Sequence, residues 1–166
     1  MHSQSTKRKF YTVSEGILSA SKYCAYQDRC QSEVRTYLQG RDLTPDEIEE
    51  VIAELISDDF INEQRFADSF VRGKFNLKKW GRIKIKNALY AKQVAEPCII
   101  EALSQIEEDH YKHTLRDIAE KKAREKGGFP LSLENKNKLF RLLLSRGFEN
   151  EYITEILNTL QQTNQK

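Results

Sequence analysis

The sequence predicts an all-α protein built from three tandem three-helix repeats that form an elongated, curved array. Three observations lead to this fold class. Charged residues make up 31% of the 166-residue chain, whereas Gly and Pro number only seven and three. Apolar residues recur almost throughout with the 3.6-residue period of an amphipathic helix. One pattern of apolar residues also occurs three times. Few helix breakers and many charges favour solvent-facing helices over strands.

The periodicity predicts nine helices, at about 13–27, 31–40, 45–57, 62–78, 81–92, 95–107, 109–126, 133–146 and 149–161. Thr44 precedes Pro45, so a capping hydroxyl is followed by proline at the first helical position. Asn62 is expected to cap the fourth helix, and Glu96 with Pro97 marks the start of the sixth. The Lys-Gly-Gly-Phe-Pro segment at 126–130 is the strongest helix stop in the chain.

Five apolar positions recur at offsets of 51 and 105 residues without a gap. The three sets are Leu38, Leu43, Ile48, Ile52 and Leu55; Leu89, Val94, Ile99, Leu103 and Ile106; and Leu143, Phe148, Ile153, Leu157 and Leu160. Any two amphipathic helices align passably, but five matches in two comparisons favour a true repeat. The sequence therefore predicts a disordered tail at 1–11 and repeats at 12–58, 59–107 and 108–162. Because each unit has a small core, it should pack against its neighbour for stability.

Charge is unevenly distributed along the chain. No acidic residue lies between Asp68 and Glu96. That window contains a candidate binding stripe, which we define as Arg72, Lys74, Lys78, Lys79, Arg82, Lys84 and Lys86. We interpret the stripe as a surface for a polyanion or an acidic partner, the alternative being a solvated helical face. Trp80, within the stripe, is expected to pack at a helix junction rather than stack on a base.

The charged residues from Asp42 to Gln64 are all acidic. This segment is either a binding face or a solubilising helix face, and the sequence leaves both interpretations open. The first unit is therefore expected to be acidic and the second basic.

Several classes of function lack their sequence signals. No stretch approaches 18 apolar residues, and no apolar signal core follows the basic residues near position 9, so we expect a cytoplasmic protein without a membrane span. Cys24, Cys30 and Cys98 are not spaced like metal ligands and are expected to be free. His110 and His113 are interpreted as surface histidines rather than metal ligands. With no phosphate loop or dinucleotide fingerprint either, we expect no enzyme, no cofactor and no metal.

The middle of the chain resembles the signature of the RecX family. In that family an Arg-Phe-Ala helix with an aromatic residue four places later is followed by Gly-x-x-x-Ile-x-x-x-Leu. Segments 62–72 (NEQRFADSFVR) and 81–89 (GRIKIKNAL) follow this pattern. The family then has Lys-Gly-Val or Lys-Gly-Ile, whereas Gln93 replaces the glycine here, which puts the local turn geometry in question. The resemblance covers about residues 13–160, including the weaker matches Arg29, Ser32, Glu33, Leu38, Arg146, Gly147 and Phe148.

This resemblance implies a DNA-repair regulator without a cofactor. Such a protein binds active RecA filaments on DNA, in the filament groove or at an end, and reduces ATP hydrolysis, strand exchange and repressor cleavage. Weak binding to single- and double-stranded DNA is also implied, so the stripe would contact DNA phosphates or acidic filament surface. We expect a monomer.

Two other classes of function remain open. One is a helical DNA-binding protein without a recombinase partner. No helix carries Arg, Asn and Gln clustered at its N-terminal end, which argues against base reading by such a protein. The other is an inert repeat scaffold for another protein.

Overall fold

The computed structural model describes residues 12–163, so the predicted disordered tail at 1–11 lies outside the described residues. The described range contains nine α-helices and no strand: α1 (Val13–Tyr26), α2 (Gln31–Gln39), α3 (Pro45–Ser57), α4 (Glu63–Asn76), α5 (Arg82–Ala91), α6 (Glu96–Ser104), α7 (Glu108–Arg124), α8 (Leu133–Ser145) and α9 (Asn150–Thr163). The all-α class is confirmed, and each predicted helix is found within three residues of its expected bounds.

The helices begin where the sequence places its capping residues. The Thr44 hydroxyl accepts a hydrogen bond from the Glu47 backbone N–H, and the Glu47 carboxylate accepts one from the Thr44 N–H at 2.7 Å. These reciprocal bonds satisfy two of the orphan donors at the start of α3. The Asn62 side chain accepts from the Arg65 N–H at 2.9 Å at the start of α4. Local chemistry therefore fixes both predicted helix starts.

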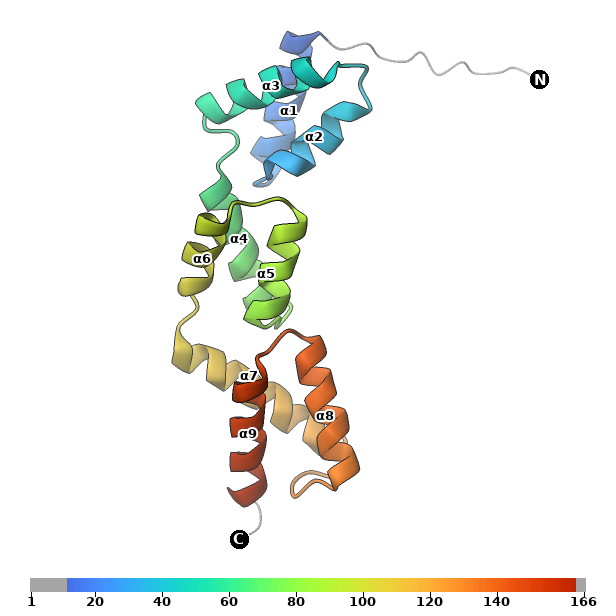
Figure 1. Cartoon of the computed structure of the whole chain (residues 1–166), viewed down its shortest axis with the longest axis vertical. Coiled ribbons are helices and arrows are strands. Elements are labelled where there is room, and N and C mark those ends of the chain that lie inside the picture. Colours follow the sequence, from blue (N-terminus) through green and yellow to red (C-terminus); the bar gives the residue numbers. More distant parts are fainter. Residues whose placement is uncertain (1–11, 164–166) are drawn as a thin grey trace, which may run out of the picture.

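The three repeats stack one after another along the long axis of the molecule (Figure 1). Helices pack mainly inside each unit: α1 and α2 against α3, α4 and α5 against α6, and α7, α8 and α9 against one another. Helices of neighbouring units pack less extensively against one another than helices of the same unit do. The predicted elongated array of three three-helix repeats is confirmed.

The recurring apolar positions form the interior. Fourteen of the fifteen predicted positions are buried, and Leu103 is half-buried. The buried side chains form two clusters rather than three. One consists of first-unit residues and Ile61, and the other runs continuously through the second and third units, joined by residues such as Phe75, Tyr111 and Phe148. Of the buried side chains described in the first unit, Cys30 alone belongs to the larger cluster.

A left-handed residue follows the second helix of every unit. Asp42, Gln93 and Gly147 occupy the same repeat position and have φ values of 57°, 60° and 88°. The Val94 N–H donates to the Leu89 carbonyl at 3.2 Å, as the Phe148 N–H does to Leu143 at 3.3 Å. Both are the long-range bonds of a Schellman helix ending. Gln93 thus preserves the turn without the usual glycine, at a cost of about 1–2 kcal/mol for the left-handed conformation.

The second and third units are joined by a close approach of two backbones at Gly81 and Gly147. The Gly81 N–H donates to the Arg146 carbonyl at 2.8 Å, and the Ile83 N–H donates to the Gly147 carbonyl at 3.0 Å. A Cβ on Gly81 would lie 2.2 Å from the Gly147 oxygen, and one on Gly147 would lie 2.3 Å from the Lys84 Cβ. Only glycine at both positions allows this contact.

We expect Gly81→Ala to lower the free energy of unfolding by about 1–3 kcal/mol, because the new methyl group must push the two backbones apart. Urea denaturation followed by circular dichroism measures the change. Gly73→Ala is the matched control, since no atom lies within 4 Å of its ideal Cβ and the site is inside α4. That control should gain up to about 1 kcal/mol from helix propensity. Equal stability of the two variants would contradict the close approach.

Candidate functional site

The candidate binding stripe is organised by the turn between α4 and α5. The Trp80 N–H donates to the Lys74 carbonyl at 3.1 Å across this turn. The Trp80 ring is half-buried and packs against the larger core. The ammonium nitrogens of Lys74 and Lys84 lie 5.0 and 4.7 Å from the ring centroid. The structure therefore brings these two lysines together around Trp80, held by cation–π attraction.

Arg82 points elsewhere, into the joint between the second and third units. Its guanidinium forms an ion pair with Glu108 at 3.1 Å and donates to the Ile106 carbonyl at 2.9 Å. The guanidinium carbon also lies 4.0 Å from the Tyr111 ring centroid. Lys84 also reaches this joint, where its ammonium donates to the Ser145 carbonyl at 3.3 Å. Arg82 differs from the other stripe residues in that a carboxylate neutralises its charge.

The remaining stripe residues lie on several sides of the second unit. Arg72 is exposed and borders a pocket that also contains Gln105 and His110. Lys78 is exposed beside a groove toward the first unit. Lys86 lies over the Tyr90 ring, with its nitrogen 5.5 Å from the centroid. The seven residues therefore form no single continuous row.

Lys79 is exposed and faces the third unit, where it shares a pocket with Lys121, Lys122 and Arg146. Sequence reasoning missed Lys121 and Arg146 as site residues, because neither lies in the acid-free window. Arg146 did carry a signal: it is the third of the basic residues that recur after the first leucine of each repeat, with Arg41 and Lys92.

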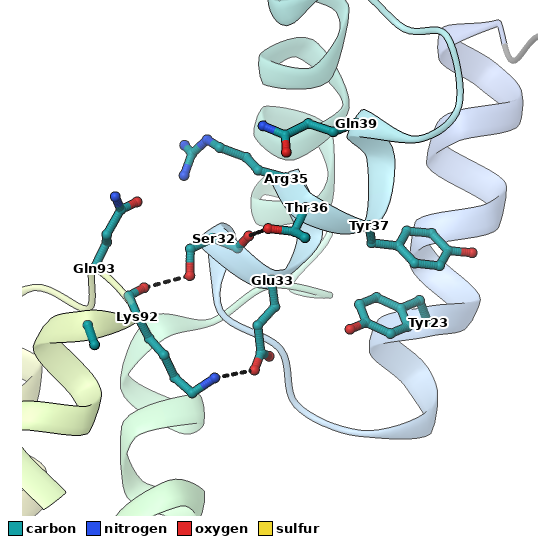
Figure 2. Close-up of a pocket in the computed structure, with 10 residues that line it drawn as sticks. Tyr23, Ser32, Glu33, Arg35, Thr36, Tyr37, Gln39, Lys92 and Gln93 are labelled. Carbon is teal, nitrogen blue, oxygen red and sulfur yellow. Dashed lines mark hydrogen bonds and ion pairs between the residues drawn. The ribbon is translucent and has the colours of Figure 1, made fainter. Parts of the chain in front are cut away.

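The first and second units meet through polar contacts, which Figure 2 shows beside a pocket of about 660 Å³. The Lys92 ammonium pairs with Glu33 at 2.6 Å, and the Ser32 hydroxyl donates to the Lys92 carbonyl at 2.7 Å. On the pocket wall, the rings of Tyr23 and Tyr37 stack with centroids 4.3 Å apart. The Lys92 charge is thus neutralised inside the protein.

The acidic segment of the first unit carries both paired and unpaired carboxylates. Arg35 donates two hydrogen bonds to Glu49, which lowers the pKa of that carboxyl. Hydrogen bonds from Asn62 and Arg65 lower the pKa of Asp59 in the same way. Other carboxylates of the segment are exposed on α3, among them Asp46, Glu50 and Glu54. The first unit therefore presents an acidic surface.

The described residues, 12–163, contain no group of three or more His, Cys, Asp or Glu side chains that could hold a metal ion. His110 and His113 are exposed, as predicted, and His113 lies 3.4 Å from Asp117. Cys24, Cys30 and Cys98 are free. No described helix is both long and apolar enough to cross a membrane.

The fold and its two joints define a tandem three-helix repeat protein. Its residues 18–55 match the family model described as RecX, first three-helix domain, and residues 62–103 match RecX, second three-helix domain. The crystal structure of RecX from Lactobacillus salivarius is similar with a TM-score of 0.80 and 30% identity, over 90% of this chain and 97% of that one. A second crystal structure, of regulatory protein RecX, shares the fold with a TM-score of 0.79 at 22% identity, over 88% of this chain and 71% of that one.

Curated relatives agree with the solved structures. Regulatory protein RecX of Bacillus cytotoxicus is 31% identical over 90% of this chain and 55% of the relative. The protein of the same name from Lactococcus lactis subsp. lactis is 32% identical over 81% of this chain and 50% of the relative. The chain belongs to the RecX family, whose members are named as regulatory proteins and not as enzymes. It spans about half the length of the curated relatives it matches.

The Tyr111 hydroxyl makes two hydrogen bonds at the joint between the second and third units. The Tyr111 hydroxyl accepts from the Arg82 backbone N–H at 3.1 Å and donates to Glu149. Burial of the phenol, followed by the bond to Glu149, raises the Tyr111 pKa. Tyr111→Phe should lower the free energy of unfolding by about 1–3 kcal/mol, because two half-buried partners lose their bonds to the buried tyrosine.

Tyr152→Phe is the control for this loss. The hydroxyl of the half-buried Tyr152 makes an exposed hydrogen bond to Glu108, so its removal should cost less than about 1 kcal/mol. Thermal and urea unfolding of the two variants provide the comparison. A larger loss in the control would contradict the assignment of Tyr111 as the buried centre of the joint.

Proposed function

We propose that this protein is a regulator of the RecA recombinase that binds RecA nucleoprotein filaments in DNA repair. It mainly inhibits the recombinase ATPase, strand exchange and co-protease activities. The observation that supports this proposal is the similarity to a RecX crystal structure over 90% of this chain and 97% of that one, at 30% identity. RecA as the partner comes from the family resemblance.

The shape and charge of the array suit such a partner. An elongated molecule offers a long surface to a long filament, and uncompensated cations attract phosphates or acidic side chains. We propose that the contact is made by stripe residues without an ion pair among residues 12–163, namely Arg72, Lys74, Lys78, Lys79, Lys84 and Lys86. Arg82 acts as a positioning residue, because it fixes the joint behind them.

The proposal includes the setting in which the protein works. It acts as a cytoplasmic monomer without a cofactor, with the units 12–58, 59–107 and 108–162 as its repeats. Its binding to single- and double-stranded DNA is weak, either direct or through the filament. The alternative is a helical DNA-binding protein without a recombinase partner, which the exposed lysines around the α4–α5 turn would also suit.

The decisive measurement is ATP hydrolysis by the matching RecA on single-stranded DNA while this protein is titrated in. We expect inhibition at well below one regulator per recombinase, since a protein that acts on the filament affects many subunits at once. A control protein of similar net charge that competes for DNA should not inhibit at these ratios. Absence of inhibition, with DNA still bound at low salt, would favour the alternative.

Charge reversal tests the proposed contact. The triple variant Lys74→Glu, Lys78→Glu and Lys84→Glu should raise the half-inhibitory concentration at least about tenfold, because attraction becomes repulsion. Its helical content, measured by circular dichroism, should not change. The control triple changes three exposed cations outside the stripe, namely Lys22, Arg116 and Arg141, to Glu; none of them has an ion pair with a residue of the described range. Equal inhibition by the stripe variant and the control triple would refute the assignment.

A further inference from the structure

A pocket of about 370 Å³ lies where the second and third units meet. Three segments that are distant in the sequence line it: the turn after α4, the C-terminal half of α7 and the end of α8. Its lining contains four cations, two carboxylates and one apolar side chain, namely Lys79, Lys121, Lys122, Arg146, Asp117, Glu125 and Ile118. The pocket is therefore a local concentration of positive charge that neither unit forms alone.

One of the two carboxylates of the pocket is neutralised by a lysine. Glu125 pairs with Lys122 at 2.8 Å, and that contact is the largest cause of its lowered pKa. Asp117 lies 3.4 Å from the His113 ring nitrogen. Within the described range, 12–163, no ion pair engages Lys79, Lys121 or Arg146. Lys79, Lys121 and Arg146 therefore outnumber Asp117, the carboxylate of the pocket that no lysine or arginine pairs with among these residues, and the excess positive charge favours entry of an anion.

Main-chain hydrogen bonds fix the backbone at two of these cations. The Arg146 carbonyl accepts from the Gly81 N–H at 2.8 Å, so the backbones of both units are fixed at this point. Lys79 precedes Gly81 by two residues, and its own N–H donates to the Phe75 carbonyl at 3.1 Å. The close approach of the glycines therefore also brings Lys79 and Arg146 to the same pocket. This preorganisation lowers the entropic cost of binding a ligand.

Lys79 occupies a position that a smaller residue would fill at lower cost. Its φ is 55°, in the left-handed region, where glycine is favoured. A side chain there is less stable than in ordinary right-handed or extended backbone. Glycine at this position would therefore stabilise the turn but would remove one of the positive charges of the pocket.

We infer that this pocket binds a phosphate group. The planar Arg146 guanidinium can donate two parallel hydrogen bonds to phosphate oxygens, while Lys79 and Lys121 supply point charges. Nucleic-acid backbone and free polyphosphate both present this chemistry. The inference rests on the proposed function for its setting, since a nucleoprotein filament carries phosphates, but the binding itself needs no recombinase.

The test uses the full chain with two probes. Fluorescence anisotropy follows labelled oligo(dT), and calorimetry at matched ionic strength follows pyrophosphate. The pocket triple, Lys79→Gln, Lys121→Gln and Arg146→Gln, is compared with the same changes at Lys22, Arg116 and Arg141. We expect the pocket triple to lose at least about tenfold in affinity, and the slope of log affinity against log salt for oligo(dT) to fall by about 2 for three phosphate contacts. The control should retain the affinity and slope of the unchanged protein.

Lys79→Gly separates binding from stability. Because glycine relieves the left-handed backbone, this variant should unfold at a higher urea concentration while its affinity for the phosphate probe falls. A structural role for Lys79 alone would leave the affinity unchanged. If the pocket triple loses binding to oligo(dT) but not to pyrophosphate, the ligand is nucleic-acid backbone. If it loses binding to both probes, the ligand is phosphate in general.

The inference is overturned if the pocket triple binds both probes as the control does, or if the unchanged chain binds neither. These outcomes are distinct from failure of the proposed function, which is measured as inhibition of RecA ATP hydrolysis. A chain that inhibits RecA but binds neither probe would retain the proposed function and lose the phosphate pocket.

Discussion

The contact between Gly81 and Gly147 is the constraint on which the second half of the molecule depends. Two backbone hydrogen bonds cross it, and neither glycine has room for a Cβ. Because the backbones meet there, Phe75, Tyr111 and Phe148 can share one core across two units. The same contact fixes α5 against the third unit, where Arg82 meets Glu108. Packing, electrostatics and the position of the charged pocket therefore have one structural origin.

The joint between the first and second units has a different physical basis. Lys92 with Glu33 and Arg65 with Asp28 are ion pairs whose side chains are all partly exposed. Such pairs contribute about 0–1 kcal/mol each and weaken as salt is added. The cores of the two units are also separate, apart from Cys30 and Ile61, each of which is buried in the cluster of the neighbouring unit. The array thus combines one joint stabilised by apolar burial and main-chain bonds with one stabilised chiefly by charge.

The sequence predicts the fold well because the repeat is a pattern of burial. Leu38, Leu89 and Leu143 recur at fixed offsets, and each is fully buried. The missing family glycine had less effect than expected: Gln93 takes the same left-handed conformation as Gly147, since the surrounding Schellman bonds determine the backbone. The merging of two cores into one was not predictable, because helical periodicity identifies a buried face but not which neighbouring unit covers it.

The binding stripe shows why charge is harder to predict than burial. The window between Asp68 and Glu96 contains no acidic residue, yet Arg82 and Lys92 each find a carboxylate from outside it, Glu108 and Glu33. Both partners belong to neighbouring units, so a one-dimensional count overestimates the free charge in the window. Folding can also increase the local charge, because it places Lys121, Lys122 and Arg146, which lie outside the window, beside Lys79. In a repeat array, free charge is therefore determined at the joints, where binding sites should be sought before the charge runs themselves.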